Sequence, residues 1–266
     1  MFLSIDTLAD ILRAAAREEL LPRFAQVERM FKTDGSIVTE ADSAMQQRIA
    51  AELAGYWPEI SLLGEEMPED RQQSLLARKE GGDGLWLLDP LDGTGNFAAG
   101  IPYFSVSLAL VRRSRIELGI IYDPLRDECF AAQHGGGALL NGQPLSVPDS
   151  LPAMAKSMGL VDFKRLEAPL AGRLAVAPPY ASQRSFGSGA LDWCMIASGR
   201  CHLYLHGGQK LWDYAAGQLI LTEAGGLSAT LEGDAVFCNS LSPRSVVAAA
   251  SPALFAEWQH WLREKP

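Results

Sequence analysis

Residues 86–97, WLLDPLDGTGNF, restrict the possible folds more than any other part of the sequence. The segment begins as an apolar run that is typical of a buried β-strand. It then ends in two acidic residues, Asp89 and Asp92, which are followed at once by Gly-Thr-Gly. Asp-Pro and Asp-Gly pairs form turns readily, because aspartate side chains bond to nearby backbone amides. The segment therefore predicts either an ordinary turn or one side of an acidic site.

The composition limits the classes of protein to which the chain can belong. With 266 residues, 48% of them hydrophobic, the chain can bury the core of one large domain or of two joined halves. A net charge of −9 argues against a nucleic-acid or anionic-membrane surface, because such surfaces need basic patches. We therefore expect neither nucleic acid nor membrane among its partners.

The N-terminal region and the cysteines indicate where the protein acts. The first residues predict an amphipathic helix without the basic leader of a signal peptide, and no run reaches the eighteen apolar residues of a membrane span. The 4 cysteines lack the spacing of a metal or redox site. They are typical of free thiols in a reducing compartment, so we expect a cytoplasmic protein.

The first half of the chain predicts helices followed by antiparallel strands. Apolar periodicity favours helices over 5–24 and 40–56, and Thr39 with Asp42 forms a capping-box pattern before the second helix. Short apolar runs at 60–64 and 85–89 predict strands. A series of further strands with turn residues between them follows.

The pattern changes near residue 150. We expect strands over 156–161, 173–178 and 202–207, helices over 190–199 and 212–226, and then a strand pair. A last amphipathic helix is expected over 253–263. Antiparallel strands with helices, followed by strand–helix alternation, favour stacked layers. We predict one unit over 1–266, with subdomains of about 1–148 and 149–266.

Two further acids extend the pattern set by Asp89 and Asp92. Glu65 follows the strand at 60–64, and Asp213 stands at the start of a predicted helix. Each has an ordinary explanation alone, as a solvated loop acid and as an acid favoured by the helix dipole. Together the four lie where loops converge over a rigid scaffold. They form a candidate site.

Four clustered carboxylates repel one another unless a cation neutralises them. Mg²⁺ prefers such oxygen ligands, and two metal ions that share a carboxylate can support displacement at phosphorus. The backbone N–H groups of Gly93 and Thr94, at a possible helix start, can then hold phosphate oxygens. The residues thus indicate metal-dependent phosphate chemistry.

With these residues in place, the sequence closely resembles the inositol monophosphatase family of Mg²⁺-dependent, lithium-sensitive phosphatases. The resemblance covers nearly the whole chain and rests on four ordered motifs. They are KTDGSIVTEAD (32–42), GEE (64–66), DPLDGTGNF (89–97) and WDYAAGQLILTEAGG (212–226). It implies an α/β fold, an αβαβα sandwich of the inositol monophosphatase/fructose-1,6-bisphosphatase type, and a homodimer.

The resemblance implies a metal-ligand set. Glu65, Asp89 and the carbonyl of Leu91 would hold a first Mg²⁺, and Asp89, Asp92 and Asp213 would hold a second, with Asp89 bridging. Glu65 would also orient the attacking water, and a third, weakly held ion there is left open.

The resemblance also implies catalytic and phosphate-binding residues. Thr94 would polarise the water, with its hydroxyl positioned by Asp42, and the amides of Gly93 and Thr94 would hold the phosphate. A plain capping box explains Asp42 equally well, and one oxygen can cap while the other faces Thr94. Lys32 lies near the site in the family motif, but we interpret it as a solvated lysine.

The expected substrate contacts are Asp92, Gly189, His206 and Asp213. In inositol-specific relatives a glutamate that binds sugar hydroxyls occupies the position of His206. An imidazole can donate or accept a hydrogen bond but lacks the two acceptor oxygens of a carboxylate. A packed or solvent-facing histidine is the alternative.

The function predicted from these residues is hydrolysis of a small polyol, sugar or related metabolite phosphate, such as an inositol 1-phosphate-like ester. Phosphatases for histidinol phosphate, fructose 1,6-bisphosphate or 3′-phosphoadenosine nucleotides are the alternatives within the family. A regulatory or interaction protein on the same fold is the alternative from another class.

Overall fold

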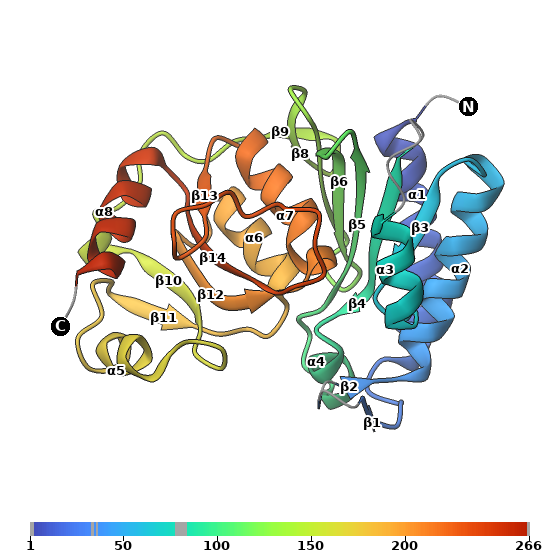
Figure 1. Ribbon diagram of the computed structural model, residues 1–266, viewed down its shortest axis with the longest axis horizontal. Coiled ribbons are helices and arrows are strands. Elements are labelled where there is room, and N and C mark those ends of the chain that lie inside the picture. Colours follow the sequence, from blue (N-terminus) through green and yellow to red (C-terminus); the bar gives the residue numbers. More distant parts are fainter. Residues whose placement is uncertain (1–2, 33–34, 36, 78–83, 265–266) are drawn as a thin grey trace.

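The computed structural model describes residues 3–32, 35, 37–77 and 84–264, and Figure 1 shows them as alternating layers of helices and sheets. The helices are α1 (Ile5–Ala15), α2 (Glu40–Tyr56), α3 (Glu69–Ala77), α4 (Thr94–Ala99), α5 (Ala168–Val176), α6 (Gly189–Ala197), α7 (Leu211–Glu223) and α8 (Pro252–Arg263). The strands are β1 (Met30–Phe31), β2 (Ile37–Val38), β3 (Ser61–Gly64), β4 (Leu85–Asp92), β5 (Ser105–Arg112), β6 (Arg115–Asp123), β7 (Glu128–Gln133), β8 (Gly137–Leu140), β9 (Gln143–Leu145), β10 (Met158–Asp162), β11 (Ser182–Arg184), β12 (Leu203–Gln209), β13 (Leu227–Ala229) and β14 (Arg244–Ala249).

The larger sheet has seven strands in the order β3-β4-β5-β6-β7-β8-β9. Only β3 and β4 run parallel, and every later pair is antiparallel, as expected for strands joined by short turns. Asn141 and Gly142, both with positive φ, form the two-residue turn between β8 and β9. The predicted antiparallel series is therefore confirmed.

Both faces of the larger sheet are buried, which explains the continuous apolar run before Asp89. Trp86 and Leu88 pack with the core of α1 and α2, whereas Leu87 packs with the core of α6 and α7. Alternate side chains of a strand leave on opposite faces. Asp89 lies two residues after Leu87, so its side chain is on the same face of the sheet, the face that α7 covers.

The first helical layer, α1 and α2, covers one face of this sheet, as the blue helices in Figure 1 show. Thr39 caps α2 with a capping box completed by Asp42, as predicted. The predicted helix over 5–24 is correct in extent to within a residue but not in type. After Ala15 the helix first widens into a π-helix at Ala16–Leu20 and then tightens into a 3₁₀ turn at Leu21–Arg23.

The middle layer consists of α6 and α7, which lie between the two sheets. Glycine permits the close contacts here: a Cβ at Gly119 of β6 would come 2.8 Å from the backbone of Ala216, and one at Gly217 would come 2.5 Å from Trp193. The small residues of the 212–226 motif therefore allow α7 to pack closely against β6 and α6.

The smaller sheet has the order β11-β10-β12-β14-β13, with α8 on its outer face. The strand predicted at 173–178 is wrong: residues 173–176 end α5, and the neighbouring strand is β11. Pro169 favours the start of a helix, and Ala, Leu and Arg favour its continuation. The strand was predicted from the short apolar run alone.

Three apolar cores separate the layers. In order, the layers are α1 with α2, the seven-stranded sheet, α6 with α7, the five-stranded sheet, and α8 with α5. This is the αβαβα sandwich that the sequence predicted. None of the helices described combines the length and apolar character that a bilayer span needs.

Candidate active site

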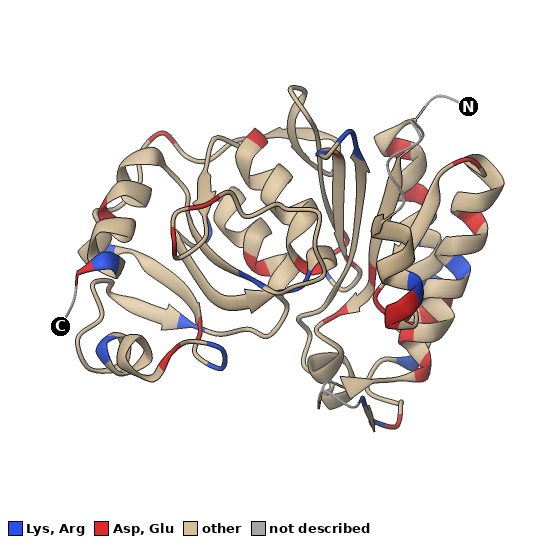
Figure 2. Cartoon of the chain, in the orientation of Figure 1, with Lys and Arg blue, Asp and Glu red and all other residues tan. Residues whose placement is uncertain are grey.

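A cleft of about 1170 Å³ opens where β4 ends and α6 and α7 begin. Figure 2 shows acidic segments at these ends. The predicted site residues that line the cleft are Glu65, Asp89, Leu91, Asp92, Gly93, Thr94, Gly189, His206 and Asp213. The remaining predicted residue, Asp42, lies buried behind Thr94. The structure therefore brings all of the predicted site residues to one place.

The register of β4 and β5 explains how Asp89 and Asp213 meet. Asp89 pairs with Ser107 across the two strands, and the Ser107 hydroxyl donates to the carbonyl of Trp212, 2.9 Å away. That bond fixes the start of α7, and with it Asp213, above Asp89. The register then shifts before Asp92, so the end of β4 bends.

Asp89 is buried, Asp92 and Asp213 are half-buried, and the charges of the three aspartates act on one another. Burial raises the pKa of Asp89 well above its ordinary value, and the charges of Glu65, Asp92 and Asp213 raise it further. Burial, followed by the charges of Asp92 and Glu65, does the same to Asp213. The carboxylates therefore stand close enough to repel one another.

Each aspartate is held by the protein through one oxygen. Oδ1 of Asp89 accepts from the Leu91 N–H, and Oδ2 of Asp213 accepts from the Lys210 N–H, 2.9 Å away. Among the described residues, the other oxygen of Asp89 and of Asp213 has no hydrogen-bond donor. These oxygens are available to a ligand.

Asp92 is tied to the start of α6. Its Oδ2 accepts from the Ser188 hydroxyl at 2.5 Å and from the Ala190 N–H at 2.7 Å. Burial nevertheless raises the pKa of Asp92 to about 6, against the effect of these donors. Gly189 lies between the two donors, and a Cβ there would collide with the Gln209 amide, which would have to give up its hydrogen bond to the Tyr204 hydroxyl.

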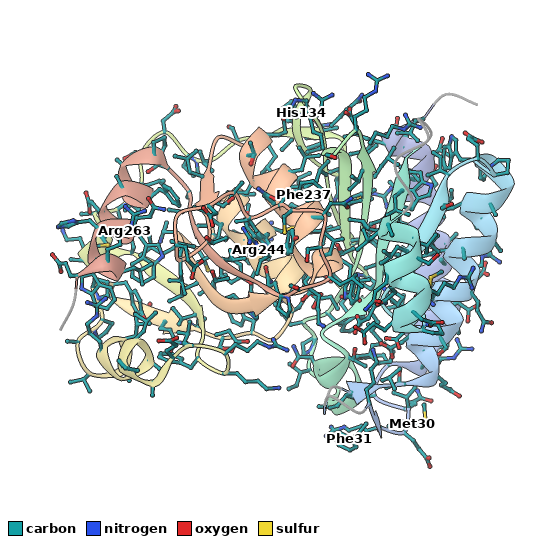
Figure 3. The ribbon with its side chains drawn as sticks, in the orientation of Figure 1. Met30, Phe31, His134, Phe237, Arg244 and Arg263 are labelled. Atoms are coloured by element: carbon teal, nitrogen blue, oxygen red, sulfur yellow. The ribbon has the colours of Figure 1, made fainter. Side chains whose placement is uncertain are left out.

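Lys32 is not the solvated side chain that we expected. Its Nζ lies 2.9 Å from Oε1 of Glu65 and 2.6 Å from Oε1 of Glu66. Burial alone would lower the pKa of Lys32, but the two carboxylates raise it above its ordinary value. Lys32 follows β1, whose exposed Met30 and Phe31 lie at one end of the molecule (Figure 3). Thr33, Asp34 and Ser36 of the same motif fall outside the described residues.

Thr94 lies between two acceptors. Its Oγ1 is 3.0 Å from Oδ1 of Asp42 and 2.9 Å from the carbonyl of Leu91, and its single hydrogen can go to only one of them at a time. Oδ2 of Asp42 accepts from Thr39, so one oxygen caps the helix while the other faces Thr94, as predicted.

Gly93 forms the turn that presents Thr94. Its φ of 90° is left-handed, and a Cβ there would meet the carbonyls of Tyr103 and Gly187 at 3.1 and 3.2 Å. Thr94 begins α4, and the first N–H groups of a helix have no partner within it. The turn therefore places the start of α4, with its unpaired helical N–H groups, in the lining of the cleft.

His206 is engaged on both ring nitrogens. Its Nδ1 accepts from the Gly208 N–H at 3.1 Å, so Nε2 carries the proton, and Nε2 lies 3.2 Å from Oδ2 of Asp162. Asp162 was not among the site residues predicted from the sequence, and neither were Arg165 and Gln209, which also line the cleft. The signal for Asp162 was the same as for Asp89: an acid at the end of an apolar strand.

The donor chemistry of the cleft suits a hard cation. Carboxylate and carbonyl oxygens on separate segments are what Mg²⁺ prefers, and mutual repulsion favours any ion that neutralises them. In the described part of the chain, no group of three or more His, Cys, Asp or Glu side chains is arranged to hold a metal ion as it stands. The oxygens therefore fit a metal ion in type and must close around it by side-chain adjustment.

The charge on Asp42 predicts a measurable pH effect. Burial raises the pKa of Asp42 to about 6 from 3.8. The folded chain thus holds this proton more tightly than the unfolded chain, so Asp42 lowers the free energy of unfolding as pH rises from 4 to 7, by up to about 3 kcal/mol. Denaturant titrations in chelator should show a steeper decline for wild type than for Asp42→Asn. Parallel curves for the two proteins would contradict the assignment, and Asp149→Asn is the surface control.

A sequence model of the inositol monophosphatase family matches residues 4–264. The chain belongs to the inositol monophosphatase family. Curated relatives include the Nus factor SuhB of Haemophilus influenzae, 35% identical over 88% of this chain and 90% of that protein. The inositol-1-monophosphatase of Mesorhizobium japonicum is 33% identical over 79% of each chain.

Solved structures of the inositol monophosphatase type share the fold. An IMPase from Thermotoga maritima superimposes with a TM-score of 0.80 at 27% identity, covering 97% of both chains. The extragenic suppressor protein suhB of Bartonella henselae gives 0.83 at 26% identity and covers 98% of this chain and 99% of that chain. Membership of the family supports a phosphatase, and the SuhB names leave open a different role.

Proposed function

We propose that the protein is a Mg²⁺-dependent phosphomonoesterase for a small polyol, sugar or related metabolite phosphate. One observation carries the proposal: Glu65 after β3, Asp89 and Asp92 in β4, and Asp213 in α7 come from three separate segments and converge on one cleft beside the Thr94 hydroxyl. No structural need explains so many coupled acids at this place, because each one raises the cost of burying the others.

The metal ligands proposed are those of the family pattern. Glu65, Asp89 and the Leu91 carbonyl would hold one Mg²⁺, and Asp89, Asp92 and Asp213 would hold another, with a third ion beside Glu65 left open. When bound, these ions supply Lewis acidity and charge neutralisation at the phosphate. Lys32 donates to Oε1 of Glu65, so Oε2 is the oxygen of that carboxylate that a metal ion could reach while the lysine stays in place.

The chain's own groups position the reactants. Thr94 donates its proton to Asp42 or Leu91, so its oxygen lone pairs are free to accept from the attacking water. Glu65 would orient the same water from the other side. The N–H groups of Gly93 and Thr94 would bind phosphate oxygens and stabilise the charge that develops there.

Asp92, Gly189 and Asp213 are the proposed substrate contacts. His206 was expected among them, but both of its ring nitrogens have protein partners, so we propose no direct contact between His206 and the substrate. Among relatives, one from Thermotoga maritima is named fructose-1,6-bisphosphatase/inositol-1-monophosphatase. That name supports inositol phosphate and fructose bisphosphate as candidates, and histidinol phosphate and phosphoadenosine esters stay as alternatives within the family.

A second candidate is a regulatory or interaction role. It is favoured by the name Nus factor SuhB, which several relatives carry. Our expectation that nucleic acid is not a partner remains a prediction, as do a homodimer, lithium sensitivity and a cytoplasmic location. The described cysteines are free thiols, which is consistent with a reducing compartment.

A phosphate-release screen over metabolite phosphates, in Mg²⁺ and in chelator, tests the proposal. We expect hydrolysis of at least one polyol or sugar ester in Mg²⁺ and a loss of at least about a hundredfold in chelator, because the metal supplies the main charge stabilisation. Asp149→Asn, an exposed acid outside the cleft, should match wild type. Absence of metal-dependent release across the panel would favour the interaction role.

A further inference from the structure

The wall of the cleft formed by the smaller sheet carries a carboxylate that the proposed metal chemistry does not use. Asp162 ends β10 and lines the same cleft as the acidic cluster. Its side chain is 30% exposed, so a ligand can reach it. The neighbouring strand, β12, pairs with β10 in parallel and places His206 beside it.

Two protein donors hold this carboxylate in position. Oδ2 accepts from Nε2 of His206 at 3.2 Å, and Oδ1 accepts from the Lys164 N–H at 2.7 Å. Hydrogen bonding from His206 is the main cause that lowers the pKa of Asp162 to about 2, so the group is ionised at neutral pH. Each oxygen keeps a further lone pair for an incoming donor.

The loop after Asp162 is held against β12 by two glycines. A Cβ at Gly207 would collide with the carbonyl of Arg165, and Gly208 lies against the Arg165 side chain. The hydrogen bond from His206 holds Asp162, and the contact with Gly207 holds Arg165, so both ends of the stretch 162–165 are fixed. The carboxylate is therefore preorganised, and binding to it costs little side-chain entropy.

We propose that Asp162 is a specificity-determining residue that accepts hydrogen bonds from hydroxyl or ammonium groups on the alcohol half of the substrate, and that His206 is its positioning residue. The proposal rests on the proposed function. If Asp162 has this role, the alcohol half of the preferred substrate carries hydrogen-bond donors in addition to the esterified oxygen. A second anionic group is disfavoured because it would face the Asp162 charge, although Arg165 and Lys164 also line the cleft.

The direct test uses four esters of one chain length: hexyl phosphate, a hexitol phosphate, 6-aminohexyl phosphate and 1,6-hexanediol bisphosphate. We expect wild type to prefer the hexitol or aminohexyl ester over hexyl phosphate in kcat/KM. In Asp162→Asn that preference should fall about tenfold or more, as expected for losing a hydrogen bond to a charged group. Asp149→Asn should keep the wild-type preference.

The role of His206 has its own readout. His206→Phe should reduce the same preference, and His206→Gln, which keeps a side-chain N–H, should recover part of it. Combined with Asp162→Asn, His206→Phe should add nothing further, because both act on one contact. Additive losses would mean that His206 does not act through Asp162.

The outcomes separate this inference from the proposed function. If wild type hydrolyses none of the four esters and no other phosphate, the proposed function fails and this inference falls with it. If wild type is active but Asp162→Asn keeps the preference, or if the bisphosphate is the preferred ester, only this inference is overturned. Should Asp162→Asn not fold, as judged by circular dichroism, Asp162→Ser is measured in its place.

Discussion

Asp92→Asn is expected to reduce Mg²⁺-dependent hydrolysis by roughly three orders of magnitude or more while leaving the fold intact. The change removes one charged ligand oxygen from the proposed second metal site, which is meant to neutralise the leaving oxygen. It also removes a half-buried negative charge that is repelled by the charge of Glu65. In chelator, the variant should therefore unfold at the same temperature as wild type or at a higher one.

The measurements for Asp92→Asn are phosphate release, Mg²⁺ uptake by calorimetry and thermal unfolding. The asparagine oxygen can still accept from Ser188 and the Ala190 N–H, so the start of α6 keeps its anchor. Asp149→Asn controls for loss of a surface charge. Full turnover in Asp92→Asn would show that the acid cluster does not bind the catalytic metal.

Thr94→Ala is expected to lower kcat by roughly two to three orders of magnitude, with a smaller change in KM. The loss corresponds to one positioned polar group in a preorganised site. The backbone donors of the Gly93 turn remain, so phosphate binding should largely persist. Stopped assays over a range of substrate concentrations separate the two constants.

Thr94→Ser is the matched control for this prediction. Serine keeps the hydroxyl that bonds to Asp42 and Leu91, and it should retain most of the activity. Equal activity in the alanine and wild-type proteins would reduce Thr94 to a turn residue at the start of α4.

Much of the fold could be predicted because local signals and tertiary packing agree. The capping box at Thr39 fixed the start of α2, and the Asn141-Gly142 pair fixed a hairpin. The prediction of a strand at 173–178 was wrong because the local signal there is weak. Six residues are too few for periodicity to separate a strand from the last turn of a helix.

The candidate site was predictable where an acid follows a strand or begins a helix. Glu65, Asp89 and Asp213 were found in this way, and Asp162 carries the same signal after β10. Its importance depends on the contact with His206, which comes from a strand more than forty residues away along the chain. No local pattern encodes such a parallel strand pairing.

Lys32 shows a second limit of the sequence. Its side chain is held by Glu65 and Glu66 in the fold, but a lysine in a glycine-containing loop carries no sign of its partner. Long-range ion pairs depend on how loops converge, and only coordinates supply that information.

The paired glycines beside His206 have a consequence for protein engineering. Because a Cβ at Gly207 would collide with the carbonyl of Arg165, the stretch at 163–167 can lie against β12 only while that position is glycine. Phe163 and Leu166 also pack against the apolar core beneath this stretch. Variants designed to change selectivity should therefore alter the exposed side chains of the stretch and keep Gly207, Phe163 and Leu166 in place.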